Sequence, residues 1–382
     1  MKILIAPDSF KGSLEAVEVT EHIEKGIKKV ISDCEIVKMP MADGGEGTVQ
    51  SLVAATDGEI YHKKVTGPLR EQVEAYYGIL GDEKTGVIEM AAASGLPLVP
   101  EDKADPSLTT TYGTGELIAT LLDENVEKII IGIGGSATND AGVGMAQALG
   151  VKFLDKQGEE IGFGGRELAK INNIDISELD PRIKDVEIEV ACDVNNPLYG
   201  EEGAAYVYAP QKGADQEMVK VLDENLRHFS KIVKKDLNQD VQSIPGAGAA
   251  GGLGAGLVAF LNAELRSGIE IILEANKIEE KLQDVDLVFT GEGEIDGQTV
   301  NGKTPVGVAK KAAKFNIPVI ALGGATGKGV EKVLDEDIDA VFSVIQKPLS
   351  LEEVFDSTGK WLEFTIEQVM RLVIISKKIN IE

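Results

Sequence analysis

Short apolar runs that end in Gly, Asp or Ser recur along the chain and constrain its fold more than any other feature. They stand at 2–6, 35–39, 128–132, 286–290, 318–322 and 340–344. The runs do not alternate apolar with polar residues, so they favour strands buried on both faces, as in a parallel sheet covered by helices. In such sheets ligands bind beyond the carboxyl ends of the strands.

Other segments predict a second kind of sheet. Three strand-like runs at 59–65, 72–79 and 86–90 are joined by turn signals, which favours an antiparallel meander. A hairpin is expected at 151–158 and a further strand at 186–191. We therefore predict an α/β fold in which a doubly wound, mostly parallel sheet domain is interrupted by a second, mixed α/β domain, with the ligand cleft between them.

The predicted domain limits follow from these runs. The Rossmann-like α/β domain is expected to comprise 1–58, 109–150 and 255–382, and the inserted domain 59–108 and 151–254.

The charge balance excludes some classes of function. The 382 residues include 38 Lys+Arg and 64 Asp+Glu, a formal net charge of −26. Nucleic-acid binding needs clustered basic residues, so this balance argues against a nucleic-acid partner. The apolar run at the N-terminus is too short for a signal peptide, and no run approaches the ~18 apolar residues of a membrane span. We expect a cytoplasmic protein, with Cys34 and Cys192 as reduced thiols.

Two glycine-rich strings match nucleotide-binding patterns in part. The segment 297–304, GQTVNGKT, fits the P-loop pattern, but the predicted strand ends near Thr290 and the intervening loop is too long. We interpret that match as a coincidence, although Lys303 remains a candidate phosphate contact. The segment 132–137, GIGGSA, fits the dinucleotide pattern. Because 138–140 is polar and Asp155 lies in a turn, it predicts phosphate binding rather than a nicotinamide cofactor.

The densest glycine cluster lies at 245–256 and leads into an apolar segment. Glycines let backbone N–H groups converge on an anion at a helix N-terminus, and they equally allow a helix to pack tightly against a sheet. The sequence leaves both interpretations open.

Carboxylates follow several of the apolar runs. They are Asp8, Asp43, Glu46, Asp140, Asp193, Glu292 and Asp296. Any one of them could be a solvated loop residue, but several at one sheet edge would suit Mg²⁺ and a base for an attacking hydroxyl. Lys11, in the first strand–helix loop, is a candidate cation for a phosphate or carboxylate, with a surface lysine as the alternative.

Motifs along the whole chain, in order, resemble those of the bacterial glycerate kinase family, type 1. They are APDSFKGS at 6–13, ADGGEGT at 42–48, EMAAASGL at 89–96, GTGEL at 113–117, IGIGGSATND at 131–140, CDVNNPL at 192–198, the glycine-rich 246–256, and TGEG at 290–293 with Asp296 and Gln298. The resemblance implies a two-domain α/β fold without a P-loop. It also implies Mg²⁺-assisted, ATP-dependent phosphorylation of D-glycerate, with 2-phosphoglycerate favoured over 3-phosphoglycerate.

The resemblance fixes the activity better than the residue roles, which are hypotheses from the positions of the residues; for Asp193 that position is a strand end beside Asn195 and Asn196. Asp193 is expected to be the base, with Lys11 and Asp8 as further catalytic residues, and Glu292 with Asp296 as the metal site. Nucleotide or substrate contacts are expected from Asp43, Gly44, Gly45, Glu46, Gly134, Gly135, Ser136, Asn139, Asp140, Gly251, Gly252 and Lys303. ATP and D-glycerate are the expected partners, and a homo-oligomer is left open.

Two alternatives stay open at the level of sequence. One is an NAD-dependent 2-hydroxy-acid oxidoreductase, which rests on the segment 132–137. The other is a non-catalytic sensor that binds glycerate or phosphoglycerate.

Overall fold

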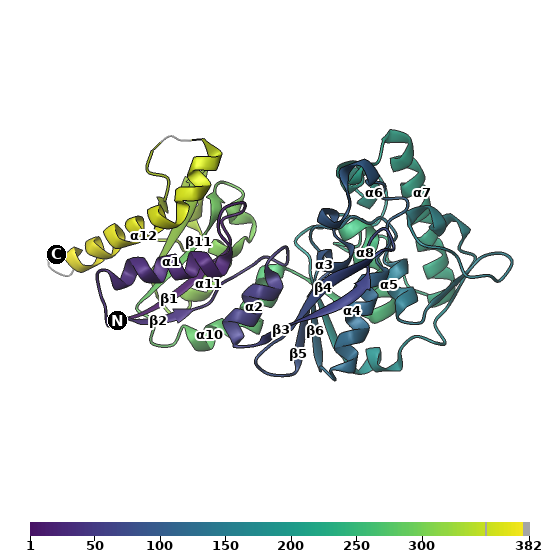
Figure 1. The fold of residues 1–382 in the computed structure, drawn as a ribbon, viewed down its shortest axis with the longest axis horizontal. Helices are drawn as coiled ribbons and strands as arrows, with labels where there is room; N and C mark the ends of the chain where they lie inside the picture. Colours follow the sequence, from purple (N-terminus) through teal and green to yellow (C-terminus); the bar gives the residue numbers. More distant parts are fainter. Residues whose placement is uncertain (348–349, 377–382) are drawn as a thin grey trace. The chain divides into compact units, whose positions relative to one another are not determined.

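The computed structural model describes residues 1–347 and 350–376, which form two compact units (Figure 1). The first comprises Met1–Asp43, Gln50–Asp57 and the chain from Ile272 onward, and the second comprises Gly44–Val49 and Gly58–Ile271. Helices α2 (Thr48–Thr56) and α9 (Gly268–Ala275) each run across a boundary between them. Within the described residues, no helix combines the length and the apolar character that crossing a bilayer requires.

The first unit is built on a five-stranded parallel sheet. Its order is β13-β12-β11-β1-β2, and its strands are β1 (Lys2–Pro7), β2 (Glu35–Lys38), β11 (Leu287–Ile295), β12 (Val319–Thr326) and β13 (Ala340–Ser343). Every pairing in it is parallel. The sequence-based prediction of a parallel sheet with buried strands is confirmed for this unit.

Strands β11 and β12 extend beyond the apolar runs at 286–290 and 318–322 that predicted them. The apolar run at 286–290 suggests that β11 ends near Thr290, but pairing with β12 continues to Ile295, opposite Thr326. The extension reads as a loop in the sequence because it is rich in Gly and Glu. Backbone hydrogen bonds to β12 keep it extended, and Ile295 at its end is fully buried.

The helices of the first unit are α1 (Ala16–Lys28), α10 (Ile278–Lys281), α11 (Thr304–Ala313) and α12 (Leu351–Ser376), with 3₁₀ turns at Thr299–Asn301 and Val330–Asp335. Helix α1 begins with a reciprocal capping box between Glu15 and Glu18. It buries Val19, Ile23 and Ile27, whose spacing places them on one face. That face contributes to a core that also contains four apolar residues of α12, Leu362, Ile366, Val369 and Met370.

The second unit holds a six-stranded mixed sheet in the order β10-β9-β6-β5-β4-β3. Its strands are β3 (Glu59–Thr66), β4 (Gln72–Ile79), β5 (Thr85–Glu89), β6 (Lys128–Gly132), β9 (Glu187–Ala191) and β10 (Glu264–Arg266). Strands β3, β4 and β5 form the predicted antiparallel meander, and β5, β6, β9 and β10 pair in parallel.

Residues 109–150 and 255–271, which were expected in the Rossmann-like domain, lie in the second unit, where β10 of the later segment pairs with β9. The reason is strand pairing, because β6 pairs with β5 on one side and with β9 on the other. The division into independently folding domains stays a prediction.

The helices of the second unit are α3 (Ala91–Ser94), α4 (Tyr112–Asp123), α5 (Val143–Ala148), α6 (Ala204–Tyr208), α7 (Gln216–Leu237) and α8 (Ala249–Leu261). A separate two-stranded ladder joins β7 (Lys152–Leu154) to β8 (Asn173–Asp175). The hairpin expected at 151–158 is therefore reduced to a tight turn and a single bridge between Leu154 and Glu160, while the ladder partner of β7 comes from further along the chain.

Candidate functional site

Asp8 lies at the carboxyl end of β1 and is the most perturbed carboxylate of the first unit. Its Oδ1 accepts a hydrogen bond from the Ser9 amide at 2.6 Å, and its Oδ2 accepts one from Thr304 Oγ1 at 2.8 Å. Burial, reinforced by the charges of Asp43 and Glu292, raises the pKa of Asp8 to about 7 against the two hydrogen bonds that lower it. A carboxylate with this pKa can both take and release a proton near neutral pH.

Glu292 and Asp296, the predicted metal site, lie at the far end of β11. Thr299 Oγ1 donates to Glu292 Oε1 at 2.6 Å, and the Lys303 ammonium lies 3.3 Å from Glu292 Oε2. Burial, with a smaller contribution from Asp296, raises the pKa of Glu292, whereas Thr299 and Lys303 act in the opposite direction. Asp296 Oδ1 accepts from the Gln298 amide at 2.8 Å. The described residues contain no group of three or more His, Cys, Asp or Glu side chains arranged to hold a metal ion.

The segment 297–304, which matches the P-loop string, forms a turn whose backbone donors are largely occupied. The Gly297 amide donates to the Lys328 carbonyl at 3.0 Å, and the Lys303 amide donates to the Thr299 carbonyl at 3.4 Å. A P-loop binds phosphate through such amides when they point inward and are free. The interpretation of this string as a coincidence agrees with that geometry.

Lys11 is exposed in the loop after β1, where the backbone makes a small turn bridged between Phe10 and Leu14. In the described part of the chain its ammonium has no hydrogen bond or ion pair. The backbone of Lys11 lies close to β11, since a Cβ built on Gly293 would stand 3.2 Å from its amide nitrogen. Lys11 therefore follows β1 closely and is available to a ligand, and its predicted role as a clamp stays a prediction.

A glycine-rich loop covers the carboxyl ends of the central strands of the second unit. A Cβ built on Gly44 would lie 2.3 Å from Ala191 Cβ at the end of β9. At the end of β6, a Cβ on Gly132 would lie 2.6 Å from the Gly44 carbonyl, and one on Gly134 would lie 3.1 Å from Gly45 Cα. Only glycine permits the approaches at Gly44 and Gly132, and the one at Gly134 is tight. The predicted contacts Gly44, Gly45 and Gly134 are thus brought together.

Glu89, a buried carboxylate at the end of β5, binds the backbone at the end of this loop. Its Oε1 accepts from the Val49 amide at 2.9 Å, and its Oε2 accepts from the Tyr76 hydroxyl at 2.9 Å. Burial raises the pKa of Glu89, although the amides of Val49 and Gly47 and the Tyr76 hydroxyl favour its ionised form. Glu89 therefore fixes the junction between the glycine loop and α2. The predicted contact Glu46 is exposed on that loop.

Asp140 accepts hydrogen bonds mainly from the backbone around it. Its fully buried carboxylate accepts hydrogen bonds from the Thr111 amide and hydroxyl, at 2.8 and 2.9 Å, and from the amides of Gly142 and Gly144, at 3.2 and 3.3 Å. Burial raises the pKa of Asp140 in spite of these four donors. The geometry makes Asp140 an anchor for the start of α5.

The preceding residues, 134–139, form an irregular segment with polar side chains that are buried. Lys212, only 2% exposed, donates from Nζ to Ser136 Oγ at 2.6 Å and to the Thr138 carbonyl at 2.7 Å. Both polar atoms of the Asn139 amide and the Thr138 hydroxyl are buried without a partner. Unpaired buried polar atoms are unusual and commonly indicate a bound water or ligand.

The glycine cluster in the first turns of α8, where Gly251 and Gly252 depart from helical geometry, packs directly on this segment. Gly251 and Gly252 have φ of +69° and +90°, and a Cβ on Gly251 would lie 1.9 Å from the Thr138 carbonyl oxygen. Gly256 approaches the Ala141 carbonyl in the same way, at 2.4 Å. These contacts support the packing interpretation of the cluster. The anion-binding interpretation stays a prediction.

Asp193, the predicted base, follows β9 and caps α9. Its Oδ1 accepts from Ser267 Oγ at 3.1 Å and from the Gly268 amide at 2.9 Å. These bonds belong to the start of a helix, where a carboxylate satisfies free amides.

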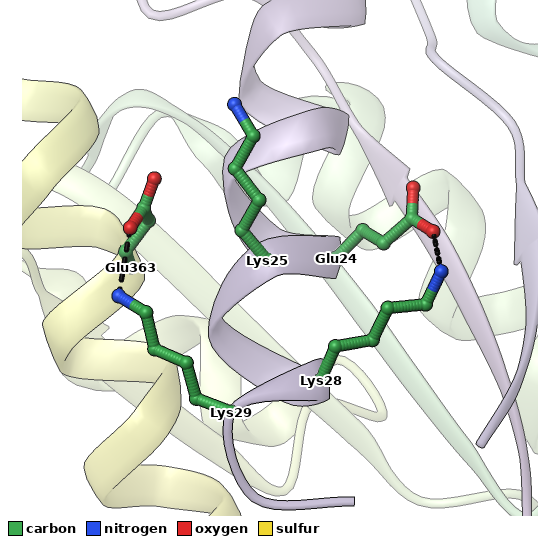
Figure 2. Close-up of a pocket in the computed structure, with 5 residues that line it drawn as sticks. All are labelled: Glu24, Lys25, Lys28, Lys29 and Glu363. Carbon is green, nitrogen blue, oxygen red and sulfur yellow. Dashed lines mark hydrogen bonds and ion pairs between the residues drawn. The ribbon is translucent and has the colours of Figure 1, made fainter. Parts of the chain in front are cut away.

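A surface depression beside α1 and α12 holds none of the predicted residues. It is lined by three lysines and two glutamates, Glu24, Lys25, Lys28, Lys29 and Glu363 (Figure 2). Lys29 Nζ lies 2.7 Å from Glu363 Oε2, and Lys28 is paired with Glu24. With two of its cations already neutralised, we do not consider this depression a phosphate site.

Three residues with site contacts were not proposed from the sequence: Glu89, Lys212 and Thr304. Glu89 lies in the motif at 89–96 and Thr304 in the P-loop-like string at 297–304, so the sequence carried a signal for both. Lys212 stands between Gln211 and Gly213 in a short 3₁₀ turn, and nothing in the sequence distinguishes it from a surface lysine.

Comparison with known proteins identifies the family. The model of the glycerate kinase family matches residues 3–374. The chain belongs to the glycerate kinase family. A glycerate kinase from Halalkalibacterium halodurans is 55% identical over 361 residues, which are 94% of this chain and 95% of that protein. Glycerate 2-kinase from Escherichia coli K12 is 56% identical, and the alignment covers 93% of each chain.

A solved structure gives the same result for the fold. A crystal structure from Salmonella typhimurium LT2, assigned as glycerate kinase 2, matches with a TM-score of 0.92 and 50% identity, over 99% of this chain and 100% of that chain. The predicted α/β class is confirmed. As a member of the glycerate kinase family, the chain is a phosphotransferase.

Family membership leaves the hydride-transfer alternative without support. In the dinucleotide pattern a helix follows the glycine turn directly. Here β6 ends at Gly132 and α5 begins only at Val143, with the irregular segment between them.

Proposed function

We propose that this member of the glycerate kinase family transfers a phosphoryl group from ATP to the 2-hydroxyl of D-glycerate, in the cytoplasm. The observation that carries the proposal is the family match over residues 3–374. The relative from E. coli that is named glycerate 2-kinase favours the 2-position over the 3-position. The proposed products are 2-phosphoglycerate and ADP.

Asp8 is the base that we propose for the substrate hydroxyl. Phosphoryl transfer requires mainly positioning and charge stabilisation, together with a group that accepts the hydroxyl proton. The pKa of about 7 suits Asp8 to that task at neutral pH. Asp193, whose position at a strand end beside Asn195 and Asn196 suggested this role, has one carboxylate oxygen committed to the α9 cap. We therefore place Asp8 ahead of Asp193.

Backbone amides and lysines are proposed to stabilise the anionic groups. The glycine loop at 44–47 lies against the carboxyl ends of β6 and β9, and the segment 134–139 follows the end of β6, where ligands bind in parallel sheets. In the first unit, Lys11 and Lys303 are the proposed cations, together with Asp43 as a contact. Lys303 is already oriented by Glu292, so it can contribute charge with little loss of side-chain freedom.

Glu292 and Asp296 are the residues proposed to hold Mg²⁺. Their oxygens are hard donors, and Mg²⁺ bound with nucleotides commonly uses one or two carboxylates plus phosphate oxygens. The influence of Asp296 on the pKa of Glu292 indicates neighbouring negative charges that a cation would relieve. When bound, Mg²⁺ neutralises charge on the transferred phosphoryl group.

The decisive experiment is ADP release from Mg-ATP in the presence of D-glycerate, with L-glycerate and no acceptor as controls. Phosphorus NMR of the product distinguishes the 2-phosphate from the 3-phosphate. We expect ADP with D-glycerate only, and 2-phosphoglycerate as product. A folded protein that releases no ADP with D-glycerate contradicts the proposal, and binding without turnover would favour the sensor.

A further inference from the structure

Lys212 is a buried cation that the proposed mechanism does not use. It closes the short 3₁₀ turn Pro210–Lys212, and Gly213 after it adopts φ of +101°. A Cβ on Gly213 would lie 2.2 Å from the Ala104 carbonyl oxygen, so the turn is seated tightly on the chain at 104. In this turn the Lys212 side chain points into the protein interior, and the residue is 2% exposed.

The ammonium of Lys212 has no ion pair among the described residues. Asp140 is the carboxylate whose charge acts on it, but the oxygens of Asp140 are taken up by Thr111, Gly142 and Gly144. Burial lowers the pKa of Lys212 to about 7. Lysine is almost never fully buried unless it is paired. Burial of an unpaired lysine destabilises the folded protein, so we expect Lys212 to have a role in function.

Both hydrogen bonds of the Lys212 side chain go to one segment. Ser136 Oγ and the Thr138 carbonyl accept them, at 2.6 and 2.7 Å. Other hydrogen bonds of this segment are between neutral groups. The Ala137 amide donates to the Ser94 carbonyl, the Leu96 amide donates to the Gly135 carbonyl, and Thr109 Oγ1 donates to the Ala137 carbonyl.

Asn139 follows directly after the residues that Lys212 holds. Its amide nitrogen and oxygen are buried without a partner, and so is the hydroxyl of Thr138. Leaving such a group unpaired costs about 1–3 kcal/mol. A segment with two unpaired side chains would be expected to rearrange so that they find partners. The hydrogen bonds from Lys212 to Ser136 and to the Thr138 carbonyl, on either side of Ala137, prevent this rearrangement.

We propose that Lys212 is a positioning residue, which through Ser136 and the Thr138 carbonyl holds 134–139 in the conformation that binds substrate and keeps the Asn139 amide free for it. This inference rests on the proposed function of that segment. Lys212 itself does not need to touch the substrate. Its loss should weaken the binding of the substrate that lies on 134–139 and leave the other substrate unaffected.

The test compares Lys212→Met with Lys220→Met in the full-length protein. Lys220 lies on α7 and makes a surface pair with Glu217, so its replacement is a matched control. In Lys212→Met we expect KM to rise at least tenfold for one of the two substrates, with the other KM and kcat within about threefold of wild type. We expect little change in Tm, because removal of the buried charge offsets the loss of the two hydrogen bonds to Ser136 and Thr138. A KM unchanged for both substrates would overturn the inference.

Two further measurements separate positioning from a general structural role. In a cycle with Ser136→Ala, the double variant should be little worse than Lys212→Met alone, because one interaction is lost in both. Additive effects would count against the proposal. Amide hydrogen exchange of 134–139 without substrate should accelerate at least tenfold in Lys212→Met, while exchange in α7 stays unchanged. Unchanged exchange in 134–139 would also overturn the inference.

The outcomes distinguish this inference from the proposed function. If the wild-type protein forms no ADP with D-glycerate, the function fails, but hydrogen exchange still tests the anchor. If Lys212→Met does not fold, Lys212→Gln, which retains a donor, replaces it. Failure of both variants to fold would make Lys212 a structural residue and overturn the inference.

Discussion

At the scale of single residues, the raised pKa of Asp8 should affect both kcat and the stability of the protein. Its pKa of about 7 lies above the unfolded value of 3.8, so ionisation of Asp8 lowers the stability of the folded protein as the pH rises toward 7. Asp8→Asn cannot ionise and should lose this penalty. We expect kcat to fall by about 100-fold or more and Tm at pH 8 to stay equal or rise. Steady-state ADP release and thermal unfolding measure the two effects.

Asp193→Asn is the comparison for that variant. The Oδ1 of asparagine can still accept the hydrogen bond from the Gly268 amide, so α9 should remain intact. We expect kcat within about threefold of wild type. If Asp193→Asn loses turnover while Asp8→Asn retains it, the base is Asp193 instead.

A second residue-scale prediction concerns Thr304. Its hydroxyl donates to Asp8 Oδ2 and lowers the pKa of Asp8, so Thr304→Ala should raise that pKa further. A base works in its ionised form, so activity should rise with pH through about 7 in the wild type and at higher pH in Thr304→Ala. Thr304→Ser keeps the hydroxyl and should leave the profile in place. An identical profile in Thr304→Ala would separate Asp8 from the proton transfer.

At the scale of elements, the start of α8 depends on glycine for two separable reasons. Gly251 and Gly158 both have left-handed φ, +69° and +83°, but a Cβ at 251 meets the Thr138 carbonyl at 1.9 Å whereas one at 158 meets nothing within 4 Å. Gly158→Ala should cost about 1–2 kcal/mol of unfolding free energy from backbone strain alone. Gly251→Ala should cost clearly more and also raise a substrate KM. Equal losses in urea unfolding would show that the contact with Thr138 is unimportant.

Strands were predictable from the sequence where burial on both faces requires a continuous run of apolar residues. The strand runs at 2–6 and 128–132 correspond to β1 and β6, because strands covered on both faces need apolar residues at every position. The extension of β11 to Ile295 was not predictable. Its residues Gly, Glu, Gly and Glu are held by pairing with a strand that lies far along the chain, and composition carries no record of that partner.

At the scale of the whole molecule, the second unit has its own sheet and the larger core cluster. A fragment of residues 44–271 should therefore fold alone and unfold cooperatively, as followed by circular dichroism. The fragment 58–271 lacks the glycine loop and the Val49 amide that satisfies Glu89, so it should be less stable. A fragment 44–271 that is unfolded in buffer would show that this unit depends on the rest of the chain.

The sequence was sufficient for the α/β class, the parallel strands and the family, because these depend on patterns within short segments and on motifs in order. It did not assign residues 109–150 to their sheet, since strand neighbours are chosen by packing across the chain. Nor did it show which polar groups would matter most. Thr304 meets Asp8 across 296 positions of sequence, and Lys212 meets Ser136 across 76. Protonation and pairing depend on desolvation and on neighbours in space, and both exist only once the chain has folded.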